Sequence, residues 1–115
     1  MNIFVKILLS SIAVIIASYL LPGVYVEDFI TAIIIAVLIS LLNVTIKPLL
    51  IILTIPITVL TLGLFLLVIN GLIILLAGSI VPGFVVDSFW WALIFSLVLS
   101  LVNSLLADLS KDGQK

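Results

Sequence analysis

The stretch LLPGVYVEDFITAIIIAVLISLLN, residues Leu20–Asn43, decides the fold, because the chain repeats it sixty positions later as IVPGFVVDSFWWALIFSLVLSLVN, residues Ile80–Asn103. Nine of the 24 aligned positions are identical. The identities include a Pro-Gly pair, a Phe, a Ser and an Asn, which an apolar composition alone would not align. Each copy reads as a turn, a short apolar stretch, an acidic residue and an apolar run. We therefore expect two tandem helical hairpins.

The composition excludes an ordinary soluble domain. The chain has 115 residues, of which 66% are hydrophobic and 8% charged, and its mean hydropathy is +1.70. Soluble domains carry about 25% charged residues. The net charge of −1 provides no basic surface, so no nucleic-acid partner is expected. Because the chain contains no Cys and no His, we predict no disulfide, no metal or other cofactor and no enzyme activity.

Runs of apolar residues predict an all-α membrane protein with four transmembrane helices. A spanning helix needs about 20 mostly apolar residues. Three runs fit this length, namely Ile3–Leu21, Phe29–Ile46 and Phe89–Leu106. The uncharged segment Pro48–Val81 would form a rod of about 51 Å, which is too long for one span. Pro56 and Gly63 are the predicted breaks in this segment.

The duplication divides a single membrane domain into four parts. These are repeat 1 (3–43), an insert (44–60), repeat 2 (61–106) and a cytoplasmic tail (107–115). Each hairpin crosses the membrane twice, so both copies enter it in the same direction. The expected result is a parallel internal repeat about an axis along the membrane normal.

The insert carries Lys47, Pro48 and Pro56. We expect it to be an in-plane interfacial helix, a re-entrant segment or part of a tilted span. Its polar residues include Thr54 and Thr58, which continue to Thr61 at a spacing that predicts a narrow polar stripe on one helix.

The lysines predict the orientation in the membrane. All four lie on one side of a four-span arrangement, at Lys6, Lys47, Lys111 and Lys115. The positive-inside rule makes that side the cytoplasm, with both termini inside. The first apolar run resembles a signal peptide, but Tyr19 and Leu20 are too large for its cleavage site, so we expect the run to be retained.

Small residues recur every four positions in two of the predicted spans. They form two small-residue stripes, at Ala32, Ala36 and Ser40 and at Ala92, Ser96, Ser100 and Ser104. Such stripes allow close approach of helices in lipid, so they indicate packing within one chain or between chains. The alternative is a hydroxyl-lined path between the two halves. Val98 lies two residues from both Ser96 and Ser100 and is expected on the far side of its helix.

Three asparagines are the most polar groups predicted at membrane depth: Asn43, Asn70, which precedes Gly71, and Asn103. An unpaired amide in hydrocarbon costs several kcal/mol, whereas an interhelical hydrogen bond contributes about 1 kcal/mol. We expect these side chains to join helices, and a contact with a solute is the alternative.

The charged residues outside the spans have two possible roles each. Glu27, Asp28 and Asp87 precede helices and fit caps, or a ring that attracts cations at an outer mouth. Lys47 fits either an anchor to lipid phosphates or a contact with a partner.

Several segments together resemble the bacterial phage-holin family of the superfamily IV type. They are Asn43, KPLL at 47–50, LTIP at 53–56, TLGLF at 61–65, Asn70 and PGF at 82–84. The resemblance extends from about Ile3 to Ala107. It implies a small multi-pass protein of the bacterial cytoplasmic membrane, and the holin label implies homo-oligomers that permeabilise that membrane. It supplies no catalytic or ligand-binding residues.

Three classes of function remain open. The first is a homo-oligomer that acts by helix–helix assembly, with a passive pore as one form. The second is an accessory subunit of a larger membrane complex, and the third is a passive carrier of small solutes. The expected partners are the lipid bilayer and either further copies of the chain or another membrane protein. Because no ionisable residue is predicted at the bilayer centre, ion-coupled transport is not expected.

Overall fold

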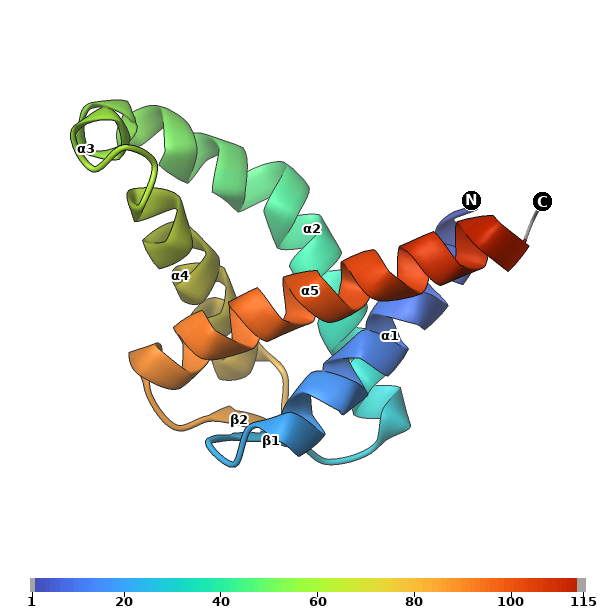
Figure 1. Ribbon diagram of the computed structural model, residues 1–115. Coiled ribbons are helices and arrows are strands. Elements are labelled where there is room, and N and C mark those ends of the chain that lie inside the picture. The colour runs from blue at the N-terminus through green and yellow to red at the C-terminus, as the bar shows by residue number, and fades with distance from the viewer. Residues whose placement is uncertain (1, 114–115) are drawn as a thin grey trace.

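The computed structural model describes residues 2–113, with side chains described through Leu109. The chain is mostly helical, as Figure 1 shows. Its elements are α1 (Ile3–Leu20), β1 (Val24–Val26), α2 (Phe29–Leu53), α3 (Ile55–Leu60), α4 (Phe65–Ile80), β2 (Phe84–Val86) and α5 (Phe89–Gly113).

Three helices are long and apolar enough to cross a bilayer. They are α1, α2 and the stretch Phe89–Leu109 of α5. The helix α4 is apolar too, but it has 16 residues. At 1.5 Å per residue it is about 24 Å long, which is less than a hydrocarbon core of about 30 Å. The described chain thus has three candidate spans and a fourth, shorter apolar helix where the sequence predicted four full spans.

The helix α2 is longer than the sequence predicted. It continues past the expected end at Ile46 to Leu53, so residues 44–53 of the predicted insert belong to α2. Pro48 lies inside the helix, where its missing N–H removes the usual hydrogen bond to the carbonyl of Val44. A membrane helix tolerates such a loss where neighbouring groups or a local adjustment of the helix satisfy the freed carbonyl.

The chain bends at both ends of α3. Pro56 lies in the first turn of α3, where its missing N–H has no helical partner to lose. Gly63 follows α3 with a φ of +90°, a left-handed conformation that favours glycine. The first bend lies at Thr54, two residues before Pro56, and the second includes Gly63.

The three threonines all belong to the six-residue helix α3, with Thr54 and Thr61 at its two ends and Thr58 inside it. Thr54 ends α2 and donates its hydroxyl to the Leu50 carbonyl at 2.7 Å. Thr61 ends α3 and donates to the Ile57 carbonyl at 2.9 Å. Thr54 and Thr61 thus satisfy carbonyls near the ends of α2 and α3, and α3 runs unbroken between them.

A two-stranded antiparallel sheet joins the two halves, and the sequence analysis did not predict it. In the register, Val24 faces Val86, Tyr25 faces Val85 and Val26 faces Phe84. The backbone N–H of Glu27 donates to the Gly83 carbonyl, and the N–H of Asp87 donates to the Gly23 carbonyl, both at 2.9 Å. These two bonds extend the pairing into both Pro-Gly turns.

The four long helices pack in a ring, because α1 contacts α2 and α5, and α4 contacts the same two helices. In Figure 1 the sheet lies at one end, while α3 and the two chain ends lie toward the other. Ile35 and Phe95 are fully buried in the core, and the ring centroids of Phe95 and Phe84 are 5.7 Å apart. Burial falls off away from the sheet, where Leu62 is 93% exposed.

Candidate functional site

The sheet region, by which we mean the two strands and the Pro-Gly turns beside them, is tightly packed. A side chain at Gly23 would collide with the indole ring of Trp91. Gly83, the matching residue of the second Pro-Gly pair, has a φ of +87° and lies against the side chain of Glu27. Glycine is required at both positions, at one for space and at the other also for conformation.

One of the three carboxylates near the sheet region is a helix cap. Asp28 accepts a hydrogen bond from the Thr31 backbone N–H at 2.8 Å, and this bond lowers the pKa of Asp28 below its ordinary value. The capping role is therefore confirmed for Asp28. Glu27 lies against Gly83 instead, and the cap of α5 is formed by Ser88, whose hydroxyl accepts from the Trp91 N–H at 3.4 Å. Asp87 donates its backbone N–H to the sheet ladder.

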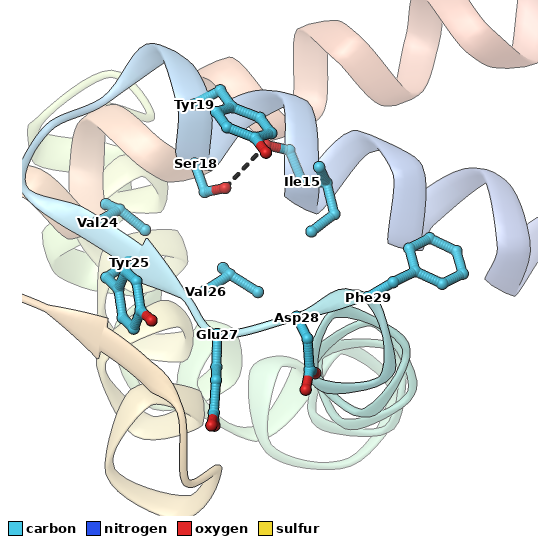
Figure 2. Close-up of a pocket in the computed structure, with 9 residues that line it drawn as sticks. All are labelled: Ile15, Ser18, Tyr19, Val24, Tyr25, Val26, Glu27, Asp28 and Phe29. Carbon is cyan, nitrogen blue, oxygen red and sulfur yellow. Dashed lines mark hydrogen bonds between the residues drawn. The ribbon is translucent and has the colours of Figure 1, made fainter.

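A half-open pocket of about 470 Å³ lies beside β1. Figure 2 shows Ile15, Ser18 and Tyr19 on one side of it, with Val26 pointing toward the same space. Glu27 and Asp28 also line the pocket, and in Figure 2 their carboxylates point away from Ile15, Ser18 and Tyr19. Among the described residues, no group of three or more His, Cys, Asp or Glu side chains is placed to hold a metal ion. The geometry does not bring the carboxylates together as a cation ring.

The small-residue stripes are buried near the sheet and exposed further along. Ala32 and Ala92 are fully buried, and Ala36 and Ser96 are nearly so. Toward the α3 end of the molecule the stripes leave the core, and Ser40, Ser100 and Ser104 are exposed. Val98 is partly buried against the core cluster, so the far side of α5 does not face lipid alone.

The asparagines are not joined by hydrogen bonds within the part of the chain that the structure describes. Asn43 is exposed on α2, and Asn103 is half-buried on α5. Asn70 is half-buried on α4 and precedes the buried Gly71. A side chain at Gly71 would press against Phe89 and Leu93, so Gly71 allows close contact between α4 and α5.

A shallow groove of about 460 Å³ follows the C-terminal half of α2. Two of the predicted insert residues, Lys47 and Pro48, line it together with Asn43, Ile51 and Ile52. Pro56 and Gly63 lie outside this groove, in α3 and in the turn that follows it. We refer to it as the Lys47 groove.

Sequence reasoning missed the contacts that stabilise the sheet region. They are the packing of Trp91 against Gly23, the packing of Phe84 against Phe95, and the cap of α5 by Ser88. The β-branched and aromatic runs Val24–Val26 and Phe84–Val86 were an available signal for strands. Their length of three residues hid them between much longer apolar helices.

Comparison with known families agrees with this geometry. The family model described as "Mycobacterial 4 TMS phage holin, superfamily IV" matches residues 1–105. The chain belongs to the superfamily IV phage holins. It is a small membrane protein of the holin type.

Two relatives of this holin carry names without a stated activity. It is 39% identical over 103 residues to "Uncharacterized membrane protein YvlD" of Bacillus subtilis strain 168, covering 89% of this chain and 87% of that one. It is 34% identical over 122 aligned positions to "Uncharacterized protein SCO3922" of Streptomyces coelicolor, covering 97% of this chain and 98% of that one. No solved structure matches the holin.

Proposed function

We propose that this holin is a tandem duplication of one helical hairpin and that it acts by assembling with copies of itself in the bacterial cytoplasmic membrane. The assembly has no catalytic role, and any flux through it is passive. The observation that carries the proposal is a set of polar side chains that lie on the apolar surface of a single chain without a partner.

The duplication is supported by the positions of the elements. β2 begins sixty residues after β1, and α5 begins sixty residues after α2. The central pair of the sheet, Tyr25 and Val85, has the same offset, as expected if a pseudo-twofold axis passes between them. The two ladder bonds of 2.9 Å are related in the same way. An axis through the sheet that relates two parallel hairpins runs along the membrane normal.

Assembly is supported by the contrast between buried and exposed serines. The hydroxyl of buried Ser96 donates to the Leu93 carbonyl at 2.8 Å, which satisfies it inside its own helix. Within the described residues, no hydrogen bond is made by the side chains of Ser40, Ser100 or Asn43. Lipid tails offer these groups no hydrogen bond, whereas the stripe of a second chain does.

Both termini are proposed to be cytoplasmic. The start of α1, the end of α5 and α3 lie away from the sheet in Figure 1, which fits an even number of crossings. Lys6, near the start of α1, and Lys47, in the second half of α2, lie toward the end of the molecule away from the sheet. Lys111 lies in the last turns of α5, and Lys115 lies outside the described residues. The rule that lysines stay inside then assigns the sheet to the outer surface.

The mass of the purified protein in lipid nanodiscs tests assembly. We expect a single homo-oligomeric species for the wild type and a loss of that species for Ser40→Leu and Ser100→Leu, because leucine blocks close approach of the stripes. Leu41→Phe and Leu101→Phe add bulk at exposed neighbours about 100° around each helix and should leave the oligomer intact. A monomeric wild type, or the capture of a different protein in fixed ratio, would contradict self-assembly.

Reconstitution in liposomes tests the mode of action. We expect either passive leak or no flux, because ion coupling needs an ionisable group at mid-depth. Solute accumulation driven by a proton or sodium gradient would refute passive action, most directly if one substitution at Glu27, Asp28 or Asp87 abolished it.

A further inference from the structure

The Lys47 groove combines a cation and an amide with an apolar floor. Asn43, Lys47 and Ile51 are four residues apart and form one ridge along α2, while Pro48 and Ile52 form the next ridge. The hollow of about 460 Å³ lies between these two ridges. Its polar groups, an ammonium and a primary amide, are both hydrogen-bond donors, so the groove suits an anion.

No carboxylate neutralises Lys47 within the side chains that the structure describes. Glu27, Asp28 and Asp87 directly follow the two strands, whereas Lys47 lies in the C-terminal half of α2. The remaining described carboxylate, Asp108, is exposed near the end of α5 and makes no salt bridge with Lys47. Among the described side chains, the charge of Lys47 is therefore not neutralised by the chain itself.

The depth of Lys47 makes an unpaired charge unfavourable. It lies 18 residues after Phe29, or about 27 Å along α2, close to the edge of a hydrocarbon core of about 30 Å. No charged residue follows it until Asp87, and the intervening Leu60 and Leu62 are 83% and 93% exposed. Exposed apolar side chains of this kind favour contact with lipid at the membrane surface, which limits the access of bulk water to Lys47. A cation at that depth pairs with an anion or pays a desolvation penalty.

We propose that the Lys47 groove binds one anionic phospholipid of the cytoplasmic leaflet. The lipid phosphate accepts hydrogen bonds from the ammonium of Lys47 and the amide of Asn43. The apolar part of the same lipid lies against Pro48, Ile51 and Ile52. This is a binding site on a single chain, and it does not depend on self-assembly.

Native mass spectrometry of the detergent-purified protein tests this site. Phosphatidylglycerol and phosphatidylcholine with identical acyl chains are added separately, and the lipid retained per chain is measured. We expect one phosphatidylglycerol to be retained in preference, and Lys47→Gln to weaken its retention about fivefold, the effect of one basic side chain near an anionic headgroup. Lys47→Arg should retain the lipid, which keeps the test decisive if Lys47→Gln does not fold.

Lys6→Gln is the matched control, because Lys6 is an exposed lysine on the same side of the molecule and lies outside the groove. It should retain phosphatidylglycerol like the wild type. Equal losses in Lys6→Gln and Lys47→Gln would show diffuse charge attraction and overturn the site. A wild type that retains phosphatidylglycerol and phosphatidylcholine equally would also overturn the site. So would a wild type that retains no lipid and whose oligomer is lost in Lys47→Gln, since Lys47 would then pair with a second chain. A monomeric wild type that still retains phosphatidylglycerol in preference would count against self-assembly alone.

Discussion

The absence of a side chain at Gly23 allows Trp91 to pack against the first Pro-Gly turn of the sheet region. The indole ring of Trp91, at the start of α5, occupies the space where a Cβ atom on Gly23 would lie. The contact joins the first Pro-Gly turn to the second half of the chain. Proline and glycine are visible in the sequence, but the partner of the glycine is a matter of tertiary packing.

Gly23→Ala should therefore destabilise the protein by about 1–3 kcal/mol, the usual effect of overpacking a tight site. Gly78→Ala is the control, because the nearest atom to its new Cβ is 3.5 Å away, an ordinary van der Waals contact. The measurement is the free energy of unfolding in mixed micelles. Equal stability of the two variants would mean that Trp91 does not pack on Gly23.

The Asp28 cap gives the stability of the protein a dependence on pH. The hydrogen bond from Thr31 lowers the pKa of Asp28 in the folded state below 3.8, so the unfolded chain takes up a proton first as the pH falls. The stabilisation is present above pH 3.8 and is lost as the pH falls through the folded pKa. In Asp28→Asn the amide oxygen still caps α2 but does not titrate, so this part of the acid-side loss should disappear. Unfolding midpoints between pH 2.5 and pH 6 measure it, and an unchanged pH profile would rule out the cap.

Among the elements, the sheet is small, yet it connects the two hairpins. Each strand has three residues, and the pairing extends by one hydrogen bond into each Pro-Gly turn. A two-stranded sheet of this size is not stable alone. The helices α1, α2, α4 and α5 support it, since all four contact the strands.

A disulfide should form between Val24→Cys and Val86→Cys. These residues face each other in the register, next to the hydrogen-bonded pair of Gly23 and Asp87. Alternation along the ladder makes them a non-hydrogen-bonded pair, with Cα atoms about 4.5 Å apart. That distance lies within the range for disulfides. The chain has no native cysteine, so loss of two hydrogens by mass after mild oxidation reports this bond alone. Val24→Cys with Leu64→Cys, at opposite ends of the molecule, should not close.

The sequence predicted the helices from the length of their apolar runs. It missed the continuation of α2 and the two strands, which depend on other properties. Apolar runs of about 20 residues indicated the starts of α1, α2 and α5, because the bilayer fixes span length. The sequence placed the end of the second span at Ile46, before Pro48, yet α2 continues to Leu53, since the penalty for proline depends on the surroundings. The strands were missed because their pairing joins residues sixty positions apart.

The candidate site was predicted in outline only. The spacing of the small residues placed Ala32 and Ala92 on core-facing positions, where they are fully buried. The same spacing did not show that Ser40 and Ser100 leave the core, because the separation of helices away from the sheet is a property of the whole packing. The Lys47 groove depends on α2 continuing past Pro48, so it was not visible in the sequence.

For the whole molecule, the arrangement in Figure 1 and the lysines lead to one orientation. The sheet end carries Glu27, Asp28 and Asp87, and the opposite end carries α3 and the two chain ends. A bilayer that retains lysines inside would place the sheet outside. An even number of crossings requires α4 to span the bilayer. With 16 residues, α4 spans a full bilayer only together with its flanking turns.

Single cysteines decide this question. Tyr25→Cys and Val85→Cys, at the exposed centre of the sheet, should react with an impermeant thiol reagent in intact cells, because both positions face the outside in the proposed orientation. Asn2→Cys and Gly113→Cys should react only after the membrane is opened. Their labelling after opening is the internal control that the thiols are accessible at all. Labelling of Gly113→Cys in intact cells, with Asn2→Cys protected, would mean an odd number of crossings. In that case α4 would not complete its span or α3 would enter the membrane, and the two hairpins would no longer face the same way.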